Sequence, residues 1–266
     1  MNKNTWDVNK DMTVKEQVTK RLVERFPCCC GKQLMLITSL SFTELKQFLS
    51  QGKINGDSCI YNVDNLASDN MFGDEKIPEN ETKKDTFRRI WKKKVAELCN
   101  QHGVGLPRHN LLFGDIMSIP LWMESDKPFD VVYADTCNNI SDKFLSWLFH
   151  EDTYNGVADD GIMAFTLMLN RGKKFKLPDE AKDNGDKFLF YGAEYDDAFN
   201  MDHYYRQMNG LAQLIESTGQ WHLEEMIHYC EKARKSQMVS VICKKGEAIK
   251  FKIEEKWEWK MRLMTC

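Results

Sequence analysis

Short, unbroken apolar runs alternate with helical patterns along most of this 266-residue chain, and this alternation limits the fold more than any other feature. Unbroken apolar runs are typical of parallel strands that are covered on both faces, whereas half-exposed strands alternate. Residues 34–37, 129–134 and 161–169 are runs of the first kind. Strands separated by helices predict βαβ units, and therefore a mostly parallel sheet with helices on both faces.

Helical spacing and capping signals place the remaining elements. Thr13 with Glu16, and Ser41 with Glu44, have the spacing of a capping box, which marks the start of a helix. The periodicity predicts helices over residues 14–26, 42–51, 83–101, 142–149 and 203–218. Further strands are predicted at residues 59–63 and 110–113, and residues 172–202 are predicted to form a loop or insertion.

The chain ends its alternating series with two strands that have no helix between them. Residues 221–229 and 237–244 are joined by about seven residues, whereas a parallel crossover needs a dozen or more. If these strands pair, they must be antiparallel. The predicted fold is therefore a doubly wound, mostly parallel sheet that ends in an antiparallel hairpin.

Composition limits partners and cellular compartment. The net charge of −3 gives no general attraction to nucleic acid or acidic membranes, so such a partner needs a local patch. No apolar run approaches the roughly 18 residues of a membrane span, and the polar N-terminus lacks a signal-peptide core. Nine cysteines without CxxC spacing predict free thiols in a reducing compartment, here the cytoplasm. The sequence has no spaced Cys/His pairs of the kind that bind a metal ion, so it predicts no metal site.

Several motifs recur in the order of a known family. These are Gly114-Asp115 after the third strand, the run 129–134 before Asp135, the run 160–167, and the closing pair of strands. Over residues 32–245 this ordered set resembles class I S-adenosylmethionine (SAM) methyltransferases, and also small methyltransferase-like proteins found in phages. The resemblance implies a Rossmann-like α/β domain with S-adenosyl-L-methionine as cofactor. Residues 1–31 are then an N-terminal helical extension, and residues 246–266 are a tail packed on the domain.

The resemblance also implies a cofactor site at the carboxyl ends of the strands, where open α/β sheets bind ligands. Asp64 would accept hydrogen bonds from both ribose hydroxyls, which one carboxylate can do. Asp115 would accept from the adenine amino group, with Ile116 packed on the ring. Ser39 and Ser41 would stand in the methionyl loop, where the family usually has glycines and this chain has none. Each of the two aspartates could instead be an ordinary turn residue.

The residues that the resemblance places next to the substrate follow the fourth strand. Amino-methylating relatives carry D-P-P-Y or N-P-P-Y there, which orients a flipped base. Here Asp135 precedes Thr136, Cys137 and Asn138, so the aromatic partner is missing. Asp135 is the candidate catalytic base and a cofactor contact, while Cys137 and Asn138 are candidate substrate-binding residues. Arg171, after the fifth strand, could bind a phosphate or carboxylate of the substrate.

The helix 83–101 is strongly basic. Arg89, Lys92 and Lys93 lie three and four residues apart and so share one face, which could follow phosphates or could simply be solvated. The expected function is that of a SAM-dependent methyltransferase. The sequence does not identify its methyl acceptor, and nucleic acid is the favoured class. The alternative is a catalytically inactive methyltransferase-like protein that acts as a binding module. A NAD-dependent enzyme is disfavoured because G-x-G-x-x-G is absent.

Overall fold

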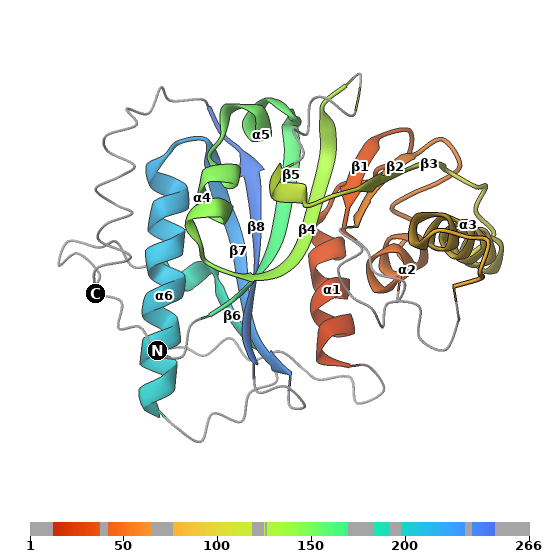
Figure 1. Ribbon diagram of the computed structural model, residues 1–266. Helices are drawn as coiled ribbons and strands as arrows, with labels where there is room; N and C mark the ends of the chain where they lie inside the picture. The colour runs from red at the N-terminus through yellow and green to blue at the C-terminus, as the bar shows by residue number, and fades with distance from the viewer. Residues whose placement is uncertain are drawn as a thin grey trace. The chain divides into compact units, whose positions relative to one another are not determined.

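The fold was obtained as a computed structural model, which describes residues 13–37, 42–64, 77–118, 125, 127–169, 184–191, 198–231 and 236–247. Figure 1 shows the elements in chain order. They are α1 (Val14–Arg25), β1 (Gln33–Leu36), α2 (Thr43–Ser50), β2 (Cys59–Asp64), α3 (Lys83–Gln101), β3 (Arg108–Phe113), η1 (Ile116–Ser118), β4 (Phe129–Asn139), α4 (Asp142–Leu148), α5 (Glu151–Asn155), β5 (Val157–Met168), η3 (Gly185–Lys187), β6 (Phe188–Tyr191), α6 (Ala198–Ser217), β7 (Trp221–Glu231) and β8 (Ser236–Lys245).

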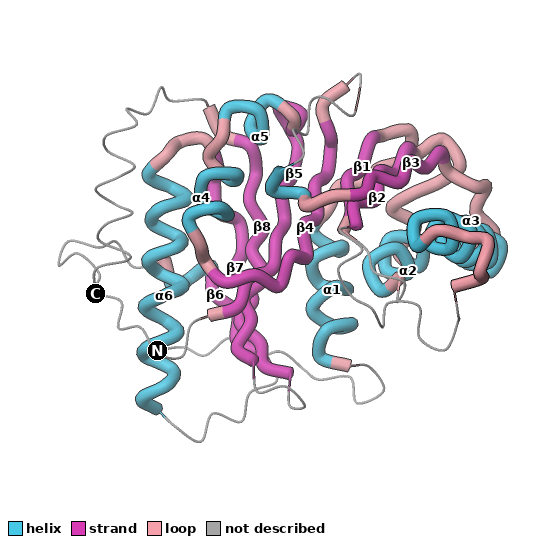
Figure 2. The backbone as a smooth tube through the Cα atoms, in the orientation of Figure 1, coloured by secondary structure: helices cyan, strands magenta, loops and turns pink. Residues whose placement is uncertain are grey.

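The strands form one sheet in the order β3-β2-β1-β4-β5-β8-β7-β6. β1 pairs in parallel with both β2 and β4, and β2 pairs in parallel with β3. The chain therefore builds outward from β1 on one side and then crosses to β4 on the other, which makes β1/β4 the topological switch point. β7 and β8 are antiparallel, and Figure 2 shows these two strands running side by side. The predicted Rossmann-like α/β fold, mostly parallel with a closing antiparallel hairpin, is confirmed.

Local capping explains where the helices begin. Thr13 and Glu16 form the predicted capping box: the Thr13 N–H donates to Glu16 Oε2 (2.8 Å) and the Glu16 N–H donates to Thr13 Oγ1 (3.2 Å). α2 begins differently from the prediction, because its N-cap is Phe42, with φ 56° and no side-chain cap bond. The proposed cap Ser41 lies outside the described residues. The left-handed backbone at Phe42 is held by burial of its ring, which is 1% exposed.

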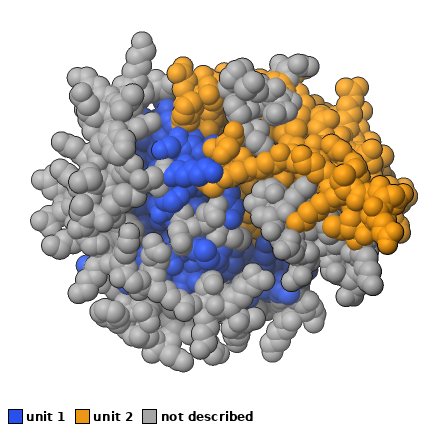
Figure 3. Space-filling view, viewed as in Figure 1, with its two compact units in different colours: residues 1–18, 136–149, 163–266 blue, residues 19–135, 150–162 orange. Residues whose placement is uncertain are grey.

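The chain divides into two compact units, coloured in Figure 3. Unit 1 comprises residues 1–18, 136–149 and 163–266, and unit 2 comprises residues 19–135 and 150–162. The division falls within α1, β4 and β5, so each of these elements contributes to both units.

Aromatic packing forms the core of unit 2. The Phe26 ring stacks on Phe48 of α2, with 5.5 Å between ring centroids, and meets Tyr133 of β4 edge-on at 6.1 Å. Trp91 of α3 is fully buried and lies 5.0 Å from the His109 ring of β3. These contacts hold α3 to β3, and they join α2 to β4 through Phe26.

The core of unit 1 is built around Trp221, at the start of β7. Its indole is fully buried, and its N–H donates to the Leu148 carbonyl over 2.9 Å. Phe144 of α4 and Phe165 of β5 pack with 5.0 Å between ring centroids. α4 is therefore anchored by both apolar packing and one buried hydrogen bond.

Several predicted bounds are wrong, and two short elements were missed. β5 begins at Val157 rather than at residue 161, and α5 and β6 were not predicted. The expected loop 172–202 in fact contains β6 and the first turn of α6. β6 has only four residues and pairs in parallel with β7, Phe188 opposite Met226. A strand this short is specified by its neighbour rather than by local periodicity. Most of the predicted tail lies outside the described residues.

Candidate cofactor site

Two carboxylates meet at the carboxyl ends of β2 and β3. Asp64 is the last residue of β2 and lies opposite Phe113 in the parallel register. The Gly114 N–H donates to the Asp64 carbonyl over 3.0 Å, so the chain leaves β3 directly beside Asp64. Asp115 is the next residue, and both aspartates are half-buried. The structure thus brings together the two acids that the sequence predicted to share one rim.

Asp115 also organises the turn that follows β3. Its Oδ1 accepts a hydrogen bond from the Met117 N–H (3.0 Å), and its carbonyl accepts from the Ser118 N–H (2.8 Å). This is the turn role that was the alternative reading of Asp115. A carboxylate has about four lone-pair positions, so the Met117 bond is compatible with a further donor. Ile116 is only 3% exposed, so its side chain belongs mainly to the core.

The sequence predicted that the fourth strand ends at Ala134, just before Asp135, and this prediction is wrong. β4 continues to Asn139, and the Thr136 hydroxyl donates to the Thr166 carbonyl of β5 over 3.1 Å. The apolar run stops at Ala134, but main-chain pairing does not require apolar side chains, so the strand extends further than the run. Because Leu36 pairs with both Asn62 and Tyr133, Asp64 and Asp135 stand two residues further along the strands on either side of β1.

The remaining predicted site residues follow β1 or β5 in the sequence, or belong to β4. Ser39, Ser41 and Arg171 lie outside the described residues. Cys137 and Asn138 belong to β4 by their backbone.

Two cations of the basic helix α3 lie close to the end of β3, and the sequence analysis did not predict a role for them. The Arg88 guanidinium carbon lies 5.1 Å from the centroid of the Phe113 ring, and Lys84 Nζ lies 5.6 Å from it. Phe113 is the last residue of β3, two before Asp115. These cation–π contacts depend on how closely α3 packs on β3, so they could not be predicted from the sequence. They place positive charge over the last residue of β3.

The three predicted cations lie further along α3. Arg89, Lys92 and Lys93 are all exposed. Arg89 Nε is 3.1 Å from Glu81 Oε1, so part of its charge is already balanced. Thr82 caps the helix by accepting from the Asp85 N–H. This face is therefore a solvated basic surface, on which Arg89 is paired with Glu81.

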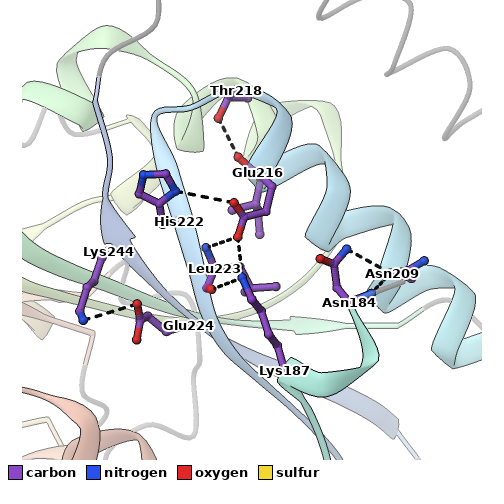
Figure 4. A network of polar contacts seen from close by, with 10 residues as sticks. Asn184, Lys187, Asn209, Glu216, Thr218, His222, Leu223, Glu224 and Lys244 are labelled. Atoms are coloured by element: carbon purple, nitrogen blue, oxygen red, sulfur yellow. Dashed lines mark hydrogen bonds and ion pairs between the residues drawn. The ribbon is translucent and has the colours of Figure 1, made fainter. Parts of the chain in front are cut away.

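Unit 1 holds a polar cluster of another kind, at the junction of η3, α6 and β7 (Figure 4). Lys187 Nζ donates to Glu216 Oε1 (2.8 Å) and to the Leu223 carbonyl (2.7 Å), and the Leu223 N–H donates back to Glu216 (2.9 Å). Burial alone would raise the pKa of Glu216. The hydrogen bonds from Lys187 and Leu223 outweigh it and leave that pKa below its usual 4.5. The cluster joins three elements to one another.

Within the described residues, no group of three or more His, Cys, Asp or Glu side chains could hold a metal ion. Each helix in that part of the chain is too short or too polar to span a membrane.

No family model and no curated protein matches this chain. Among solved structures it is similar to a type I restriction-modification methyltransferase subunit from Streptococcus thermophilus, with 13% identity and a TM-score of 0.45, covering 90% of this chain and 45% of that one. It is also similar to the M. jannaschii tRNA m1G37 methyltransferase, with 9% identity and a TM-score of 0.43, covering 87% of this chain and 49% of that one.

A third similar structure is the 1,6-didemethyltoxoflavin-N1-methyltransferase of Burkholderia thailandensis, which has S-adenosylhomocysteine bound. Identity is 9% and the TM-score 0.42, over 87% of this chain and 78% of that one. The chain spans less than half of each of the first two structures. With TM-scores no higher than 0.45, these similarities assign no activity to it.

Proposed function

We propose that this chain is a SAM-dependent methyltransferase that binds the adenosine part of its cofactor at the carboxyl ends of β2 and β3. The observation that supports this most directly is the hydrogen bond from the Gly114 N–H to the Asp64 carbonyl, because it sets Asp64 beside Asp115. Asp64 would accept from the ribose hydroxyls and Asp115 from the adenine amino group. Half-buried carboxylates suit this role, since they remain open to a ligand from solvent.

The other residues proposed for the site follow β1 and β5 in the sequence or belong to β4. Ser39 and Ser41 would contact the methionyl group in place of the glycines usual in the family. Asp135 would contact the cofactor and hold the proton released by the acceptor, while Cys137, Asn138 and Arg171 would line the substrate. When bound, SAM supplies an electrophilic methyl group. Because attack on that group needs little acid–base help, the chain would contribute mainly by positioning the acceptor.

Calorimetric titration with SAM and with its demethylated product tests the cofactor assignment. The proposal expects saturable heat from the wild type. Asp64→Asn and Asp115→Asn each remove one charged acceptor, which costs about 1.5–3 kcal/mol, or on the order of tenfold to a hundredfold in affinity. Asp57→Asn is the matched control, because Asp57 is an exposed aspartate just before β2, at its opposite end. Absence of heat at millimolar cofactor would refute the proposal.

We propose nucleic acid as the acceptor class. Exposed Lys92 and Lys93, with Arg89, would contact phosphates, and Lys84 and Arg88 would continue that positive surface to the rim of the site. A band-shift titration tests this with the triple variant Arg89→Glu, Lys92→Glu, Lys93→Glu. We expect its binding to fall at least tenfold, while Lys20→Glu, an exposed cation on α1, serves as control. Equal binding by the triple variant and the wild type would exclude this face.

A further inference from the structure

A rigid turn joins α1 to β1 and contains three consecutive cysteines. The backbone of the central one, Cys29, is held on both sides. Its N–H donates to the Lys53 carbonyl (2.6 Å), and its own carbonyl accepts from the Lys32 N–H (3.0 Å) and from the Ser58 hydroxyl (2.8 Å). Gly31 completes the turn with φ 71°. The positions of the two flanking cysteines are therefore fixed by the main chain.

The three thiols lie in two different environments. Cys29 is fully buried, and burial raises its pKa to about 12, which makes it a poor nucleophile. Cys28 and Cys30 are both exposed, and their Sγ atoms lie 2.9 Å apart. A disulfide requires about 2.0 Å between the sulfurs, so the reduced pair needs only a small movement to close.

The surroundings distinguish the two exposed thiols. When Cys28 ionises, the Cys30 thiol can donate a hydrogen bond to it, which lowers the pKa of Cys28 and raises that of Cys30. The positive charges of Lys53 and Lys32 lower the pKa of Cys28 further. Lys53 is held in place because its Nζ donates to the Phe26 carbonyl over 2.7 Å. Cys28 is thus the better attacking thiol, and Cys30 stands beside it to resolve the product.

We propose that Cys28 and Cys30 form a thiol–disulfide exchange site that reacts with small-molecule disulfides. The Cys28 thiolate attacks one sulfur of the disulfide, a mixed disulfide forms, and one small thiolate leaves. Cys30 then loses its proton to solvent and attacks Cys28 Sγ, which closes the Cys28–Cys30 bond and expels the second small thiolate. The two protons end on the released thiols. The two cysteines are oxidised, and one disulfide is reduced to two thiols.

This site is separate from the proposed cofactor site. The turn leads into the amino end of β1, and the Cys59 N–H at the amino end of β2 donates to the Lys32 carbonyl (2.9 Å). Asp64 and Asp115 lie at the opposite, carboxyl ends of these strands. SAM binding should therefore be the same for the oxidised and reduced forms, and failure of either proposal leaves the other standing.

Mass spectrometry of one tryptic peptide tests the proposal in the full-length protein. Cleavage after Arg25 and Lys32 releases residues 26–32, which contain all three cysteines and no others. The native protein is incubated with oxidised glutathione, the reaction is stopped with an alkylating reagent under denaturing conditions, and the peptide is sequenced. We expect a peptide that has lost two hydrogens, with the single alkyl group on Cys29. Cys230, half-buried and alone in the tryptic peptide 207–232, is the internal control thiol.

The Cys30→Ser variant separates the two steps of the exchange. Without the resolving thiol, Cys28 should accumulate as its glutathione mixed disulfide, several-fold above the wild-type level and above Cys230. Cys28→Ser should instead slow the reaction of the remaining exposed thiol several-fold. Wild-type protein with both Cys28 and Cys30 alkylated after treatment would overturn the proposal. So would a bond from either of them to Cys29, or equal mixed-disulfide levels in Cys30→Ser and the wild type.

Discussion

One pair of polar side chains in each unit shows two different uses of such groups. In unit 1, the buried Thr166 and Ser240 hydroxyls lie 2.9 Å apart, between β5 and β8. In unit 2, Asp64 and Asp115 stand half-buried at the ends of parallel strands. Polar groups inside a core must be satisfied there to be tolerated, whereas those at a sheet rim can serve a ligand. Unit 1 should therefore control stability, and unit 2 binding.

The strongest test of this comparison is Trp221→Ala in unit 1. The change removes a fully buried indole and leaves the Leu148 carbonyl without its 2.9 Å donor. Truncation of a buried aromatic costs about 3–5 kcal/mol in the free energy of unfolding. Urea denaturation followed by circular dichroism measures the loss, and Leu106→Ala provides the control because the Leu106 side chain is 53% exposed. A loss as small as that of the control would show that Trp221 does not anchor the core.

The next largest effect concerns His228 and acid. Burial lowers its pKa from 6.5 to about 3, so the folded protein keeps this ring neutral. Between those two values the unfolded chain binds the extra proton, and stability therefore falls as the pH falls. The loss amounts to about 3 kcal/mol from pH 6.5 to about pH 4. Denaturation midpoints recorded across this range measure it.

His228→Phe is the variant that isolates this contribution. The substitution keeps an aromatic ring against Tyr204, whose centroid lies 5.4 Å away, but cannot take up a proton. Its unfolding free energy should be lower than the wild-type value at pH 7 and should change less with pH below 6.5. Parallel pH profiles for the two proteins would contradict the assignment of the acid sensitivity to this residue.

The fold could be predicted from the sequence where local pattern and tertiary structure agree. α3 has the predicted bounds, because Phe87, Ile90 and Trp91 repeat at helical spacing and all face the core. The pairing of Asp64 with the end of β3 also followed, since parallel strands align their carboxyl ends. In both cases a pattern visible in a few residues was sufficient.

Other features depend on contacts between distant segments and could not be predicted. β4 continues past its apolar run because neighbouring strands provide main-chain partners for polar residues. β6 is a strand only because β7 lies beside it. The cations at the site rim, Lys84 and Arg88, were missed because their proximity to Phe113 arises from how α3 packs on β3. Helical spacing selected Arg89, Lys92 and Lys93 instead.

A smaller effect is expected from Glu216→Gln in unit 1. The variant loses the ion pair with Lys187 and weakens the bond from the Leu223 N–H, which together should lower stability by about 1–2 kcal/mol at pH 7. The pKa of Glu216 is lower in the folded than in the unfolded protein, so its contribution is present above pH 4.5 and is lost as the pH falls through the lower folded value. Unfolding curves for wild type and variant should therefore converge in acid. A difference that persisted unchanged at low pH would assign it to packing instead.

The smallest effect on stability, but a measurable one on binding, is expected at the rim of unit 2. Lys84 and Arg88 are exposed and lie over the Phe113 ring, and cation–π contacts at exposed sites contribute only about 0.5–1 kcal/mol each. The double variant Lys84→Ala, Arg88→Ala should therefore remain folded. If these cations contact the acceptor's phosphates, the salt dependence of nucleic-acid binding should weaken, with about one unit lost from the log–log slope per phosphate contact removed.

The double variant Lys92→Ala, Lys93→Ala is the matched comparison on the same helix. Both residues are exposed and lie one to two turns further from the candidate site along α3. A surface that guides nucleic acid to Asp115 requires the rim pair to contribute to methyl transfer as well as to affinity, whereas the distal pair should contribute to affinity alone. The two variants are compared by their rates of methyl transfer at saturating nucleic acid. Equal losses would mean that the nucleic acid binds along α3 but is not directed to the rim. Binding by α3 would then be separate from the proposed methyl transfer.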